Sequence, residues 1–87
     1  MKQKIATAVA QKILFLPHAI KQMSRPDRMI TTDEVREAVL SGKIIEEYPE
    51  NQHGESCLVM HTTQNRVIHV ICAPKAEYLA VITAYLP

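Results

Sequence analysis

The chain has 87 residues, of which 47% are hydrophobic and 22% charged, and its formal net charge is +1. This length allows a single domain over residues 1–87, because such a chain buries only roughly 60–65% of its unfolded surface in one small core. An ordinary apolar fraction with a small net charge excludes a disordered chain. No apolar run approaches the roughly 20 residues of a membrane span, so we expect no membrane partner.

Two cysteines, Cys57 and Cys72, are too few for the disulfide framework of a small secreted domain. Two early lysines precede a short apolar stretch, but Gln11 and Lys12 interrupt it and no small-residue cleavage site follows. We therefore expect a cytoplasmic protein whose cysteines are buried small hydrophobic residues.

Charge is unevenly distributed along the chain. Residues 1–43 hold eight Lys and Arg against four acids, which gives +4, whereas residues 44–87 hold two against five, which gives −3. The simpler interpretation is two solvated faces, and the sharper one is an anion-binding surface on the first half. The basic half makes a nucleic acid a candidate partner, although the net charge of +1 argues against one.

The first part of the chain has the pattern of short helices. Residues 3–14 have helical composition, but residues 12–16 fit a short strand equally well, and periodicity does not decide between them. Pro17 suits a first helical position and predicts a helix over 17–24. This helix must end before Pro26, which disfavours helical geometry at the preceding residue.

The next helix has the clearest boundary signals. Thr31 and Glu34 have the spacing of a capping box, in which each residue binds the backbone N–H of the other. Val35, Ala38 and their neighbours form its apolar stripe. Gly42 is placed to end the helix as a C′ glycine.

From residue 43 onward the pattern is typical of strands. Four strands are expected, at residues 43–48, 57–63, 66–73 and 78–85. The order of helices and then strands predicts an α+β domain, with two or three N-terminal helices on one face of a four-stranded antiparallel meander.

A two-residue loop at residues 64–65 predicts the register of the central hairpin. It places Thr63 opposite Arg66 and Cys57 opposite Cys72. One face then carries Cys57, Val59, His61, Ile68, Val70 and Cys72, and the other carries Leu58, Met60, Val67, His69 and Ile71. Both faces are largely apolar, so one must pack on the helices and the other is a partner surface or the wall of a cleft.

Four stretches, taken in order, carry a family resemblance. They are Pro17-His18-Ala19 with Met23, Arg28-Met29-Ile30-Thr31 before Asp33-Glu34-Val35, the run from Gly42 to Tyr48, and Ile68-His69-Val70 followed by the run from Val81 to Pro87. Together they resemble the bacterial domain-of-unknown-function family 4258 over about residues 16–87, which leaves residues 1–15 as an N-terminal extension. The chain departs from the family pattern at Gln22, where the family has Arg, and by two extra residues before Arg28.

The resemblance implies a fold similar to the RelE-like and barnase-like toxins, which are small metal-independent ribonucleases often paired with an antitoxin. The partners that it implies are RNA and a cognate antitoxin, and it implies neither a cofactor nor a metal.

Metal-free RNA cleavage needs a general base, a general acid and groups that hold the phosphate. His18 is the expected base or acid, because histidine titrates near neutral pH and this one lies at a helix start. His69, Thr83 and Tyr85 are expected to complete the cleft, with Thr83 donating to phosphate and Tyr85 donating or stacking on a base. Arg28 is the expected phosphate clamp, assisted by two further basic residues. These two are Arg25 and Lys21.

Each of these residues also has a structural interpretation, as a packed histidine, an ordinary strand residue or a solvated arginine. A rival function is a non-enzymatic interaction module that pairs through its second apolar sheet face, as a homodimer or beneath a larger partner. A zinc-binding domain is a weaker third interpretation, because no His or Cys pair has the spacing of a zinc motif.

Overall fold

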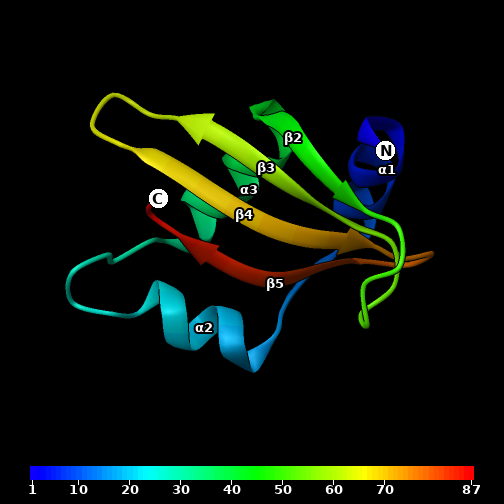
Figure 1. Cartoon of the computed structure of the whole chain (residues 1–87), viewed down its shortest axis with the longest axis horizontal. Coiled ribbons are helices and arrows are strands. Elements are labelled where there is room, and N and C mark those ends of the chain that lie inside the picture. The colour runs from blue at the N-terminus through cyan, green and yellow to red at the C-terminus, as the bar shows by residue number, and fades with distance from the viewer.

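Three helices and five strands make up residues 1–87, all of which the computed structural model describes (Figure 1). The helices are α1 (Lys2–Gln11), α2 (Pro17–Met23) and α3 (Thr32–Ser41). The strands are β1 (Ile13–Phe15), β2 (Lys43–Tyr48), β3 (Ser56–Thr62), β4 (Val67–Pro74) and β5 (Leu79–Tyr85). The predicted α+β class is confirmed, and each predicted helix and strand is present with ends shifted by a few residues.

The sheet differs from the prediction of a four-stranded antiparallel meander. It has five strands in the order β1-β5-β4-β3-β2, and β1 runs parallel to β5, with Ile13 beside Leu79 and Phe15 beside Val81. The ambiguous segment 12–16 is therefore a strand. Three residues are too few to display an alternation of polar and apolar side chains, which is why its pattern does not distinguish a strand from a helix.

Both ends of α3 follow the prediction. The Thr31 hydroxyl accepts from the Glu34 N–H at 3.1 Å, and the Glu34 carboxylate accepts from the Thr31 N–H at 3.0 Å, which is a capping box. Gly42 ends the helix as predicted, and it does so at φ −76°, an ordinary conformation rather than the left-handed one common after helix ends. The reason for glycine is steric, because a Cβ there would lie 2.4 Å from the Ala38 carbonyl oxygen and 2.6 Å from Val59 Cγ1.

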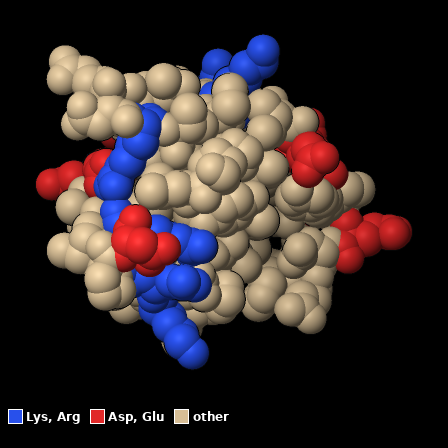
Figure 2. Space-filling view, turned by 60° about the vertical axis from the view of Figure 1, so that its left-hand side comes forward, with Lys and Arg blue, Asp and Glu red and all other residues tan.

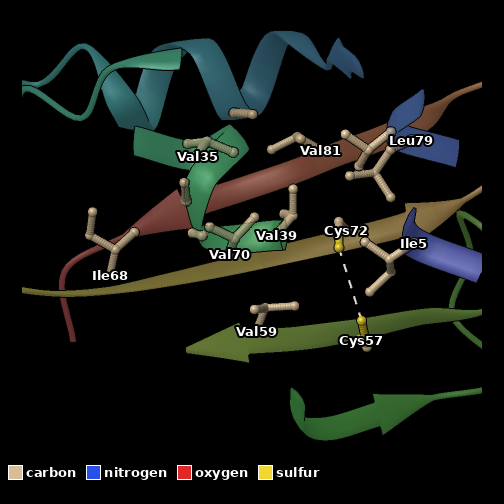
Figure 3. Packing of buried hydrophobic residues seen from close by; sticks show 14 of the residues in the cluster. Ile5, Val35, Val39, Cys57, Val59, Ile68, Val70, Cys72, Leu79 and Val81 are labelled. Atoms are coloured by element: carbon tan, nitrogen blue, oxygen red, sulfur yellow. Dashed lines mark hydrogen bonds between the residues drawn. The ribbon is translucent and has the colours of Figure 1, made fainter. Parts of the chain in front are cut away.

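The predicted hairpin register is confirmed. Thr63 donates its N–H to the Arg66 carbonyl at 2.8 Å, and Cys57 pairs with Cys72. The face predicted to carry both cysteines packs on the helices, and Val59 and Val70 lie beside them in one buried cluster with Ile5 and Val35 of the helices (Figure 3). Burial of this face is the main stabilising contribution, since apolar burial contributes about 25 cal/mol per Å².

The opposite face of the sheet, which we call the outer face, has no helix across it (Figure 1). It carries Leu58, Met60, Val67, His69 and Ile71 of the central hairpin. The β2–β3 loop, residues 49–55, borders it at the end where Ser56 and Ala73 are fully buried. Helix α2 lies alongside β5 and directs Ala19 and Met23 into the core. The outer face is thus open between α2 and β2.

The contact at Gly42 predicts a large effect of a single added methyl group. Gly42→Ala should lower the free energy of unfolding by roughly 1–3 kcal/mol, because a Cβ so close to a carbonyl oxygen forces the backbone or Val59 to shift. Urea denaturation followed by circular dichroism would measure the difference. Ser41→Ala at the neighbouring exposed position is the matched control, and an equal stability of the two variants would contradict the steric explanation.

Candidate functional site

A β-bulge in β5 brings two of the predicted site residues, Thr83 and Tyr85, onto the outer face, where His69 of β4 also lies. Cys72 pairs with Val81 on the buried face, but the next pair is Ile71 with Thr83, so Ile82 is the additional residue. In a regular strand Val81 and Thr83 would point to the same face. The bulge instead turns Thr83 and the residue two places further, Tyr85, toward the open side of the sheet.

His69 and Tyr85 form a direct pair on this face. They are opposite each other in the β4–β5 ladder, and their ring centroids lie 5.4 Å apart with an interplanar angle of 62°. This edge-to-face geometry is a favourable arrangement of aromatic rings. Both side chains are only partly buried, so their polar atoms remain accessible to a ligand on the outer face.

His18 lies at the edge of the same face, in a pocket of about 520 Å³. The pocket lies between the start of α2 and the β2–β3 loop, with Ile71 and Ile82 at its sheet side. Ile71 is the ladder partner of Thr83, so the pocket adjoins the row that contains Thr83. His69 and Tyr85 do not line the pocket and lie further along the sheet, so the structure brings three predicted residues together and places His18 beside them.

The predicted phosphate-binding residues are less free than the sequence suggests. Arg28 is half-buried and donates to the Gln22 side chain at 2.7 Å, and Arg25 pairs with Asp27 at 3.4 Å. Lys21 is exposed on α2. Figure 2 shows Lys and Arg side chains gathered in a band on this side of the molecule, with acidic side chains among them. Gln22, which binds Arg28, lies one helical turn after His18, which lines the pocket. The two residues therefore lie on the same face of α2.

Arg66 is a central residue of this region that the sequence does not identify. From the β3–β4 hairpin it donates to the carbonyl oxygens of Arg28 at 2.5 Å and Met29 at 3.1 Å, and to the Glu34 carboxylate at 2.7 Å. Met29 has φ 48°, a left-handed conformation that is unfavourable for a non-glycine residue. The Arg66 contacts hold this segment in place and so fix the backbone that carries Arg28.

The charge asymmetry along the sequence does not become two charged halves in space. Arg66 of the acidic half pairs with Glu34 of the basic half, and Lys4 of the basic half pairs with Glu55 at 2.6 Å. Charges of the two halves therefore partly pair with each other, and an anion-binding surface on the first half stays a prediction.

Tyr48 and Glu46 mark the β2 side of the outer face. The Tyr48 hydroxyl donates to the Glu46 carboxylate at 2.5 Å, and this hydrogen bond raises the pKa of Tyr48 to about 12. A carboxylate here disfavours an anion on the β2 side, whereas the basic band lies near α2.

The two cysteines face each other in the core as free thiols, with 4.0 Å between their Sγ atoms (Figure 3). The hydrogen bond with Cys57 and burial raise the pKa of the Cys72 thiol, which keeps it neutral. The expectation that both are buried hydrophobic residues is confirmed. No three His, Cys, Asp or Glu side chains come close enough to share a metal ion. None of the helices has the length and apolar character that crossing a membrane requires.

Sequence reasoning also left out the pocket's loop residues. The sequence does not identify Asn51, Gln52 and His53 as pocket residues, because nothing in their spacing indicates that the loop bends toward His18. Two signals were available, Gly54 and Lys75. Gly54 has φ 94°, and Lys75 donates to the His53 carbonyl, so together they fix the loop at the edge of the sheet.

Comparison with known proteins identifies a family. The model of a family described as a domain of unknown function, DUF4258, matches residues 15–86. No curated protein and no solved structure matches the chain.

The Arg66–Glu34 contact predicts a dependence of stability on acid. Desolvation acts to raise the pKa of Glu34, but hydrogen bonds from Thr31 and Arg66 outweigh it, so the pKa lies below its usual value of 4.5. A carboxyl group whose pKa is lowered by folding stabilises the protein above its unfolded pKa, and this contribution is lost as pH falls through the folded pKa. Stability should therefore fall below about pH 4.5 more steeply in the wild type than in Glu34→Gln.

Glu37→Gln, an exposed change in the same helix, is the matched control and should keep the steep acid limb. Thermal unfolding between pH 3 and pH 7 measures the profiles. Identical profiles for Glu34→Gln and the wild type would show that Glu34 gains nothing from its partners.

Proposed function

The chain belongs to the DUF4258 family, and we propose that it is a toxin-like, metal-independent ribonuclease of the RelE-like and barnase-like type. The observation that carries this proposal is the placement of His69, Thr83 and Tyr85 together on an uncovered sheet face, with His18 in the adjoining pocket. An α+β fold with the helices on the other face of the sheet is consistent with it.

The residue types on this face match the needs of phosphodiester cleavage through the ribose 2′-hydroxyl. His18, as base, takes the 2′-hydroxyl proton while the 2′-oxygen attacks phosphorus. The bond from phosphorus to the 5′-oxygen breaks, and a protonated His69 supplies the proton for that leaving oxygen. The strand then ends in a 2′,3′-cyclic phosphate. In a second arrangement the two histidines exchange roles.

The remaining residues hold the substrate. Thr83 donates a hydrogen bond to a non-bridging phosphate oxygen, and Tyr85 stacks on or donates to a base beside it. Arg28 retains guanidinium donors besides the one bound to Gln22 and serves as the phosphate clamp. Arg25 and Lys21 attract the strand through longer-range charge.

The proposal is tested by induced expression in a bacterial host, with growth and RNA integrity followed over time. Wild type should slow growth and cut RNA, and the purified protein should cut RNA in the presence of a chelator. His18→Ala should lower the cleavage rate about 10²–10⁴-fold, which is the usual contribution of a general acid or base.

His61→Ala is the matched control, because His61 lies on the opposite face of the same hairpin and should keep full activity. Intact RNA with the wild-type protein, in cells and in vitro, would overturn the ribonuclease proposal.

A second candidate function is a non-enzymatic interaction module, for which the openness of the outer face is the supporting observation. Met60 and Ile71 are partly exposed and present an apolar surface that a second copy or an antitoxin would cover. This function predicts a solution mass of twice 9.8 kDa at high concentration. Met60→Glu should then restore the monomer, whereas Leu40→Glu on exposed α3 should not. A strict monomer in sedimentation equilibrium would contradict self-association.

A further inference from the structure

The pocket beside His18 has the composition of a ligand site for a flat, partly polar molecule. Its volume of about 520 Å³ lies within the range of small-molecule pockets, about 300–1,000 Å³. Leu16, Pro17, Ile71 and Ile82 supply an apolar floor and wall. The other lining residues form a polar rim, which consists of His18 at the start of α2 and of Asn51, Gln52 and His53 in the β2–β3 loop. An apolar floor under a polar rim suits a planar heterocycle that stacks below and hydrogen-bonds at its edge.

The polar rim is held in place before any ligand binds. The His53 N–H donates to the Asn51 side-chain oxygen at 2.8 Å, and the Gly54 N–H donates to the Asn51 carbonyl at 2.8 Å. Lys75 reaches across from the β4–β5 turn to donate to the His53 carbonyl. A Cβ at Gly54 would lie 2.5 Å from the Lys75 Nζ, so the loop and this lysine are closely packed. A rim fixed in this way loses little entropy on binding.

The free hydrogen-bonding groups of the rim favour one class of base. The Asn51 side-chain oxygen accepts one hydrogen bond within the loop, and its NH₂ group is available to a ligand. Gln52 is exposed, and its NH₂ group lies 3.4 Å from the Nε2 atom of His53, which leaves its carbonyl oxygen and one N–H for a ligand. An amide of this kind matches an edge with adjacent donor and acceptor, as in adenine, to which glutamine and asparagine bind in a bidentate manner.

We propose that this pocket binds a purine base, adenine by preference, in the RNA strand next to the phosphate at which His18 acts. A free adenine nucleotide presents the same ring as an adenine in RNA. The inference that the base belongs to an RNA strand therefore rests on the proposed function. The pocket adjoins Thr83 through Ile71, so a base in it places its own phosphate toward the outer face. Gln52 is then the specificity-determining residue.

Nuclear magnetic resonance of the ¹⁵N-labelled full chain tests the site. The probes are the four nucleoside 3′-monophosphates and the 2′-O-methylated pentanucleotides UUAUU and UUUUU, which cannot be cleaved. Adenosine 3′-monophosphate and UUAUU should shift the amides of Gln52, His53, Ile71 and Ile82, and UUAUU should bind about tenfold more tightly than UUUUU.

Gln52→Ala should remove this tenfold preference, whereas the matched control Gln64→Ala, in the hairpin loop at the other end of the sheet, should retain it. Equal affinity for all four bases, or shifts confined to other residues, would overturn the purine site. If adenosine 3′-monophosphate binds but UUAUU does not, the ligand is a free nucleotide and not a base of an RNA strand. RNA cleavage without any base preference would support the ribonuclease proposal and overturn the purine site. Adenine binding without RNA cleavage would support the purine site and overturn the ribonuclease proposal.

Discussion

The guanidinium group of Arg66 is the contact on which the relative placement of the hairpin and the helices depends. One planar group donates to the capping carboxylate of α3 and to two successive carbonyl oxygens in the α2–α3 connection. Each of these acceptors would otherwise need water at a crowded junction. Arginine meets this need because its donors lie in a fixed fork, and lysine would supply only a point charge. The hairpin that carries His69 and the helix pair that carries His18 are thus joined at one end.

Two features of the sheet then determine which side chains lie on the outer face. The bulge at Ile82 turns Thr83 and Tyr85 toward His69, and the parallel contact of β1 with β5 positions α2 at the sheet edge, through a hydrogen bond from the Leu16 N–H to the Val81 carbonyl. Without the bulge the polar ends of Thr83 and Tyr85 would point into the helix-covered core. A buried hydroxyl without a partner costs about 1–3 kcal/mol, so the bulge also removes a penalty from the fold.

Sequence reasoning succeeded where a feature is local. The capping box at Thr31 and the hairpin register around residues 64–65 depend on residues close together in the chain, and both follow from spacing alone. It failed where a feature depends on distant partners. The contacts of Arg66 and the approach of the β2–β3 loop to His18 arise only after the sheet forms, and the bulge at Ile82 is a backbone irregularity with no residue signature. The candidate site combines both kinds, so its residue types were predictable and its geometry was not.

The pairing of β1 with β5 has a kinetic consequence. Ile13 must find Leu79 near the other end of the chain, whereas the hairpins β2–β3, β3–β4 and β4–β5 join neighbouring segments. Contacts between residues far apart in sequence form more slowly, because more of the chain must be ordered to close the loop. The meander is thus the part of the sheet that assembles first, and the edge next to β5 stays unpaired until β1 docks. During synthesis α2 and its histidine take their final place only after the last strand has left the ribosome.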